Sequence, residues 1–119
     1  MKVKGLVFLG TRTSEFDKMV GFARDVLGLS PRIEGPDFAV CELPNGDKIE
    51  IFGPRDKDHD FMTCPVAGFL VEDVEQARAE MEAKGIEFIG PVQRWGEDIS
   101  WSHFRAPDGH VYEITNQPS

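Results

Sequence analysis

The sequence predicts an α+β fold in which one βαβββ unit occurs twice. Each half begins with an apolar strand, continues with an amphipathic helix that ends at a glycine, and finishes with short strands. The halves comprise residues 1–53 and 63–116, with a polar linker at 54–62. Near its end each half has a turn and then a strand with one glutamate between apolar residues, Glu50 and Glu113. A repeat at this period indicates a duplicated supersecondary unit, and 119 residues suffice for a single domain.

The elements of the first half follow from its cap and turn residues. A β-rich run at 3–11 leads into a helix at 14–27, with Ser14 as the expected N-cap and Gly28 at the end. Strands are expected at 31–34, 38–42 and 48–52, the last two joined by a turn at 44–47. The helix is expected to bury the apolar residues that recur every three or four positions: Phe16, Met19, Val20, Ala23, Val26 and Leu27.

The second half repeats this order. A strand at 66–71 precedes a helix at 73–84 that Asp73 caps and Gly85 ends. Strands are expected at 86–89, 99–105 and 111–115, and residues 91–98 are expected to form a mobile loop. The buried helical stripe comprises Val74, Ala77, Met81 and Ala83.

The composition and net charge limit the classes of binding partner and the expected cellular location. The formal net charge of −8 argues against nucleic acid and anionic membranes and favours neutral or cationic ligands; the alternative is that acidity only maintains solubility. Cys41 and Cys64 are expected as buried thiols in a reducing compartment. Without a signal-peptide pattern or an apolar run of membrane-spanning length, the expected location is the cytoplasm.

Two motifs carry a resemblance to a known family. The segment Asp25-Val26-Leu27-Gly28-Leu29 follows the first helix, and a Pro107-Asp108-Gly109 turn leads into the strand of Glu113. In a duplicated pattern, these motifs resemble the vicinal oxygen chelate superfamily, which includes glyoxalase I, bleomycin-resistance proteins and extradiol dioxygenases. The resemblance implies two βαβββ modules that form a curled mixed sheet around a cup, and homodimers. In enzymes of the family it implies a divalent ion held by histidines and glutamates from the first and last strands of each module.

When the metal-ligand positions of the family are assigned one by one to residues of this sequence, the ligand set is incomplete. Glu50 and Glu113 match the glutamate positions, but Phe8 and Val66 stand about where the histidines are expected. Two carboxylates make a poor site for zinc, nickel or iron, which proteins hold with three or four ligands. No cofactor is therefore expected. The alternative is a divalent ion on Glu50 and Glu113, with magnesium or manganese as the hard ions that two carboxylates and water suit.

Three further residues are candidates for ligand contact. His103 lies ten positions before Glu113, where the ring-cleaving dioxygenases place a tyrosine that faces the cup. It is a candidate catalytic proton donor, substituted metal ligand or hydrogen-bonding contact, the alternative being a histidine on half-wet sheet surface. Trp95 and Trp101 suit planar or cationic ligands, the alternative being a tryptophan on a dimer surface. His59 and His110 are expected to be solvated.

These observations leave three functions. The first is a metal-free small-molecule-binding protein resembling the bleomycin-resistance branch, with Phe8, Val66, Trp95, Trp101, His103, Glu50 and Glu113 around the ligand. The second is a lyase, isomerase or dioxygenase that uses Glu50, Glu113 and His103. The third is a structural or regulatory dimer with a vestigial cup.

Overall fold

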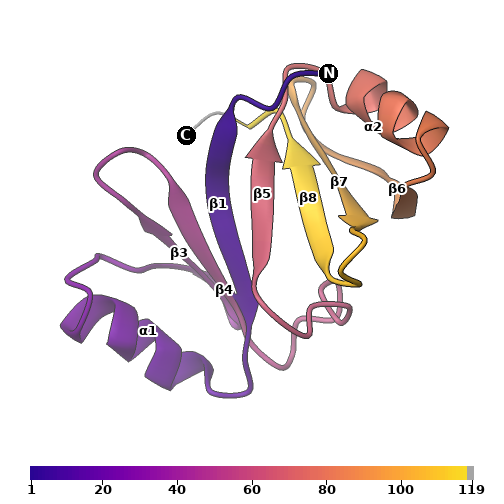
Figure 1. Cartoon of the computed structure of the whole chain (residues 1–119). Helices are drawn as coiled ribbons and strands as arrows, with labels where there is room; N and C mark the ends of the chain where they lie inside the picture. Colours follow the sequence, from indigo (N-terminus) through magenta and orange to yellow (C-terminus); the bar gives the residue numbers. More distant parts are fainter. Residues whose placement is uncertain (118–119) are drawn as a thin grey trace. The chain divides into compact units, whose positions relative to one another are not determined.

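The computed structural model describes residues 1–117 and has the α+β fold that the sequence predicts. Within these residues, two helices and eight strands follow one another as two successive βαβββ units (Figure 1). Internal contacts divide the chain into two compact units. We call Phe8–Pro65 the first module, and Met1–Val7 together with residues 66–117 the second module.

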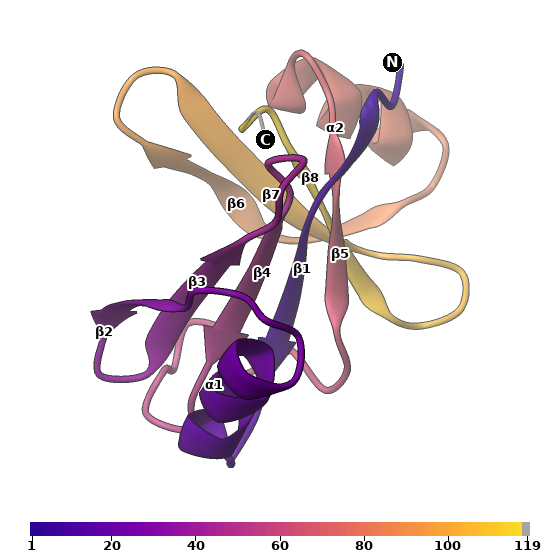
Figure 2. The ribbon, with the colours of Figure 1, turned by 90° about the vertical axis from the view of Figure 1, so that its left-hand side faces the viewer.

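In the first module the strand order is β2-β3-β4-β1, with β1 parallel to β4 and the other pairs antiparallel. Helix α1 packs on β4 (Figure 2). The predicted bounds of β3 and β4 are confirmed. The elements are β1 (Gly5–Arg12), α1 (Phe16–Asp25), β2 (Arg32–Gly35), β3 (Phe38–Glu42) and β4 (Lys48–Phe52). The core consists of Val20, Ala23, Ala39, Cys41 and Ile51.

Both ends of α1 differ from the prediction. The N-cap is Glu15 and not Ser14, and the hydroxyl of Thr13 accepts the backbone N–H of Glu15 at 2.9 Å. The helix ends at Asp25, before the predicted Leu27. Val26 and Leu27 therefore lie in the turn toward Gly28 (φ 71°) and are 69% and 48% exposed, so their predicted burial was wrong. A glycine is required there because φ is positive.

In the second module the strand order is β5-β8-β7-β6, with β5 parallel to β8 and the other pairs antiparallel. As predicted, Asp73 caps the helix and accepts the backbone N–H of Gln76 at 3.0 Å. The elements are β5 (Val66–Leu70), α2 (Val74–Ala83), β6 (Glu87–Trp95), β7 (Ile99–Arg105) and β8 (Val111–Thr115). The core consists of Val71, Val74, Ala77, Phe104 and Ile114, while Ala83 is exposed.

The segment predicted as a mobile loop is mostly strand. β6 continues through Trp95 and pairs with β7 on both sides of a register shift between Ile89 and Gln93. Gly90 (φ 69°) and Pro91 occupy the shift, so they mark a bulge in a strand that continues into the predicted loop.

The helices among residues 1–117 are too short and too polar to cross a membrane.

Candidate functional site

His103 and Glu113 form a buried pair on neighbouring strands of the second module. They lie opposite each other in the β7–β8 register, and His103 Nε2 is 2.8 Å from Glu113 Oε1. The residues are 5% and 7% exposed. Burial raises the pKa of the Glu113 carboxyl well above its ordinary value of 4.5, because the surroundings solvate the charge poorly. At this distance one proton lies between nitrogen and oxygen, so the pair can give or accept a proton.

The strand register defines the face on which this pair lies. β7 pairs with β8 without a shift, so Ile99, Trp101 and His103 share one face. The alternate residues point to α2: Phe104 is in its core cluster, and Ser102 Oγ accepts from Arg78 of α2 at 3.1 Å. The pair therefore lies on the face opposite the helix.

Both tryptophans lie on the face of the pair. Trp101 Nε1 donates to Gln93 Oε1 at 3.0 Å, which fixes the indole plane. Trp95 pairs with Ile99 in register, which assigns it to the same face at the far end of the β6–β7 hairpin, where it is 76% exposed. Trp101 and Trp95 thus place aromatic surface on this face of the β6–β7 hairpin, between the polar pair and the tip of the hairpin.

On the side of β8 that faces β5 and not β7, a glycine lies next to Glu113. The β5–β8 register places Gly68 opposite Glu113, with Val66 two residues earlier on the same face. Since glycine has no side chain, β5 contributes neither a metal donor nor steric bulk beside the carboxyl.

The corresponding position in the first module has different neighbours. Glu50 on β4 lies between Gly10 on β1 and Val40 on β3. Phe8, the predicted ligand-position residue, lies two residues before Gly10 on the same strand face. A β-carbon on Gly10 would lie 3.3 Å from Phe8 Cε2 and 3.1 Å from Met62 Cε, so apolar side chains fill the space beside this glycine.

The segment between the repeats also packs on the first module. The ring of His59 stacks on Phe52 with centroids 3.9 Å apart, and His59 Nδ1 is 2.6 Å from Asp56 Oδ2. The predicted solvation of His59 was therefore wrong for a side chain that is 24% exposed, whereas His110 is exposed as expected. The sequence pattern did not indicate this stacking, because His59 lies among charged residues and its aromatic partner Phe52 lies on another segment.

Of the predicted site residues, the structure brings together Glu113 and His103 directly and gathers Val66, Trp101 and Trp95 on their face. Glu50 and Phe8 belong to the first module. Sequence reasoning missed Gly68 and Gln93. A glycine inside an apolar strand is a signal of close approach by another group, and could have indicated Gly68.

The donor set at the pair is small for a transition metal. Across residues 1–117, three or more His, Cys, Asp or Glu side chains do not gather in a metal-binding arrangement. His103 and Glu113 supply two donors, and their neighbour Gly68 supplies no side chain. Zinc and iron sites normally take three or four protein ligands, so this pair does not by itself fit the family's metal centre.

A family comparison agrees with the motifs. The model of the Glyoxalase/Bleomycin resistance protein/Dioxygenase superfamily matches residues 5–114. The chain belongs to this superfamily. A search of curated proteins finds no match.

Solved structures share the fold at low sequence identity. Methylmalonyl-CoA epimerase from Mycobacterium tuberculosis is 17% identical with a TM-score of 0.71, covering 98% of this chain and 90% of that one. A superfamily member from Vibrio splendidus 12B01 is 20% identical with a TM-score of 0.67, covering 93% and 97%. A Streptomyces coelicolor methylmalonyl-CoA epimerase variant, in complex with 2-nitronate-propionyl-CoA, is 14% identical with a TM-score of 0.71, covering 99% and 100%. These likenesses establish the fold alone.

Proposed function

We propose that this superfamily member binds a small neutral or cationic molecule at the His103–Glu113 pair, without a transition metal. The observation that carries the proposal is the buried pair at 2.8 Å, with Gly68 on one side and aromatic surface on the other. Ligand sites combine mostly apolar walls with a few placed polar groups, and this face has both.

The face also favours a ligand of particular shape and charge. The hydrogen bond to Gln93 holds the Trp101 ring in place, so a planar ligand can stack on it with little ordering of the protein. The burial that raises the pKa of Glu113 means that the surroundings solvate a negative charge poorly, so a second carboxylate would lose its hydration there without compensation. A neutral hydrogen-bonding group or a delocalised cation therefore suits the site better than an anion.

Three probes of the same size test this preference: benzamide, benzamidinium and benzoate, which are neutral, cationic and anionic. Trp95→Phe leaves Trp101 as the sole tryptophan, since the chain contains two, and its fluorescence then reports on this face. We expect saturable quenching by benzamide and benzamidinium but not by benzoate. His103→Gln and Glu113→Gln should each weaken binding about tenfold, because each removes one hydrogen-bonding partner of a ligand.

His110→Gln and Glu87→Gln serve as matched controls, because both residues are exposed and lie outside the site. Binding that these controls weaken as much as the site variants would contradict the proposal. Absence of quenching by all three probes would also contradict it, and would favour the structural or regulatory dimer.

A second function, proton transfer by an enzyme, is favoured by one specific observation. A carboxyl with a raised pKa and a histidine at 2.8 Å resembles the acid–base pairs that move protons near neutral pH. Two of the three solved structures described above are named as methylmalonyl-CoA epimerases. We therefore propose, as the alternative, that Glu113 exchanges a proton with a carbon acid while His103 positions the carboxyl.

Deuterium exchange at the 2-position of an acyl thioester, followed by NMR in heavy water, tests the alternative. Exchange above the rate of buffer, lost in Glu113→Gln and retained in Glu87→Gln, would support it. Metal analysis of the same samples before and after chelation shows whether a divalent ion contributes. Binding without exchange would leave the ligand-binding proposal standing and reject the enzyme.

A further inference from the structure

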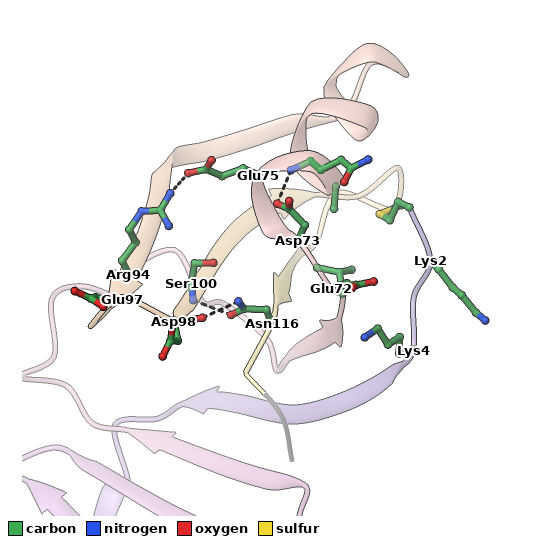
Figure 3. A pocket seen from close by; sticks show the side chains of 14 residues that line it. Lys2, Lys4, Glu72, Asp73, Glu75, Arg94, Glu97, Asp98, Ser100 and Asn116 are labelled. Carbon is green, nitrogen blue, oxygen red and sulfur yellow. Dashed lines mark hydrogen bonds and ion pairs between the residues drawn. The ribbon is translucent and has the colours of Figure 1, made fainter.

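A hollow lies in the second module, on the side of the sheet away from the His103–Glu113 pair. It has a volume of about 740 Å³ and lies between the start of α2, the end of the β6–β7 hairpin and the residue that follows β8 (Figure 3). Its floor residue Ser100 alternates with Trp101 along β7 and therefore faces the helix side. The volume is within the range of small-molecule sites.

Ser100 is the feature of this hollow that points to a ligand. The residue is 6% exposed and lines the hollow, and its hydroxyl forms no hydrogen bond with the described residues. Figure 3 shows its side chain turned toward the start of α2. Among residues 1–117, Arg12 Nε is the fully buried side-chain polar atom that lacks a partner, so the Ser100 hydroxyl is in contact with solvent through the hollow and can offer a hydrogen bond there. A bound molecule with a polar group would supply the partner of the Ser100 hydroxyl.

Asn116 holds this part of the hollow in place. Its Oδ1 accepts the backbone N–H of Ser100 at 2.8 Å, and its Nδ2 donates to the backbone oxygen of Asp98 at 2.8 Å. One side chain thus ties the end of β8 to the start of β7 and fixes where Ser100 and Asp98 lie. A preorganised frame of this kind lowers the ordering cost of binding.

The charges around the hollow select the type of ligand. Five acidic and three basic side chains line it, so the balance is negative. Arg94 forms an ion pair with Glu75, and Asp73 is occupied as the cap of α2. Three carboxylates have no ion-pair partner within residues 1–117, and they come from both sides of the hollow: Glu72, Glu97 and Asp98.

The two lysines of the hollow, Lys2 and Lys4, are exposed on its rim. Figure 3 shows the Lys2 side chain directed away from the other labelled residues. The carboxylates that line the hollow are exposed as well, so it is the excess of five acidic over three basic side chains, and not burial, that favours a cation. Long lysine side chains can direct their ammonium groups into water and offset this excess only in part.

We propose that this hollow binds a small aliphatic amine. One ammonium group donates to Ser100 Oγ and to the carboxylate of Asp98 on one side, Glu72 is available on the other side, and the hydrocarbon part lies along Val71 and Ala77 at the start of α2. A diamine satisfies this arrangement best, because carboxylates from two sides of the hollow can each receive one ammonium group. The site is separate from the one proposed for His103 and Glu113.

Isothermal titration with 1,4-diaminobutane tests the proposal, and succinate, which has the same chain length and the opposite charge, is the matched probe. We expect saturable binding of one diamine per chain and none of succinate. Ser100→Ala keeps the backbone hydrogen bonds of Ser100 and should weaken diamine binding about tenfold, as should Asp98→Asn and Glu72→Gln. A rise in melting temperature with diamine, lost in the same variants, provides a second readout.

Glu87→Gln controls for general acidity, because Glu87 is exposed on β6 outside the hollow. If it weakens diamine binding as much as Asp98→Asn does, or if binding disappears at about 0.15 M salt, the attraction is diffuse and the proposal fails. Absence of a heat signal together with an unchanged melting temperature would also overturn it. His103→Gln should leave diamine binding unchanged, which distinguishes this site from the one on the other face.

Discussion

The two modules place a glutamate at the same point of the same fold, yet the neighbours of the two glutamates differ. In both modules the glutamate lies on the last strand and faces a glycine of the first strand, Gly10 or Gly68. On the other side Glu50 faces Val40, whereas Glu113 faces His103 at hydrogen-bond distance. One position on the neighbouring strand therefore determines whether a module has an acid–base pair.

The wider surroundings of the two glutamates differ in the same way as their direct neighbours: they are apolar in the first module and include polar groups in the second. In the first module Phe8 and Met62 fill the space beside Gly10, and the rings of Phe52 and His59 stack nearby. In the second module the polar pair continues into the face that carries Trp101. We infer that duplication kept the backbone and left the side chains free to specialise, since a fold constrains polar sites far less than it constrains the core.

The largest effect is expected from the core isoleucine that follows each glutamate. Ile51 and Ile114 are 0% and 1% exposed. Ile51→Ala and Ile114→Ala should each lower the free energy of unfolding by about 2–5 kcal/mol, because each leaves a cavity in its own core. Urea unfolding followed by circular dichroism measures the loss. The same unfolding curves test whether the modules unfold together. Modules that unfold independently would give two transitions, and each variant would shift only the transition of its own module.

A loss below about 1 kcal/mol in either variant would contradict the burial that the structure assigns to that isoleucine. Phe22→Ala, on the exposed side of α1, is the control and should change stability far less.

A smaller effect is expected when the second module is made to resemble the first. His103→Val gives Glu113 the kind of neighbour that Glu50 has, and it leaves the carboxyl buried without its imidazole partner. The expected loss is about 1–3 kcal/mol, the usual penalty for an unsatisfied buried polar group. The double variant His103→Val with Glu113→Leu should recover much of that loss, because two apolar side chains need no hydrogen bond. Additive losses in the double variant would indicate that the two residues do not act as a pair.

Most of the fold was accessible from sequence because its signals are local. Turn and alternation patterns gave the bounds of β3, β4, β7 and β8, and Asp73 marked the cap of α2. The errors occurred where distant partners override local preference. The pattern predicts a strand at 86–89 and a loop at 91–98, but pairing with β7 continues β6 through Trp95 across a bulge.

The site was only partly predictable for a related reason. The spacing and alternation of residues suggested that His103 and Glu113 belong together, but their direct contact depends on the register between two strands. Likewise, the residues opposite the glutamates are Gly10 and Gly68, which a single sequence does not reveal. The stacking of His59 on Phe52 also arises from tertiary packing between segments that the pattern treats separately.

The pH dependence of stability provides the finest comparison. Burial raises the pKa of Glu113 in the folded protein above that of the unfolded chain, so between these two pKa values the folded state binds more protons. The contribution of this group to stability is therefore fully present below the unfolded pKa and is lost as pH rises through the folded pKa. Glutamine does not titrate, so Glu113→Gln should gain stability relative to wild type as pH rises above about 4.5 and then level off.

Urea unfolding of both proteins over this pH range measures the difference, and Glu87→Gln, which replaces a carboxylate that stays in water, should follow the wild-type curve. A difference between Glu113→Gln and wild type that stays constant would mean that folding leaves the pKa of the carboxyl unchanged, which contradicts the raised pKa. A difference that shrinks with rising pH would mean that the buried carboxyl is ionised at low pH in the folded protein. The imidazole of His103 would then carry the proton of the pair as an imidazolium, and the second module would hold an ion pair where we infer a shared proton.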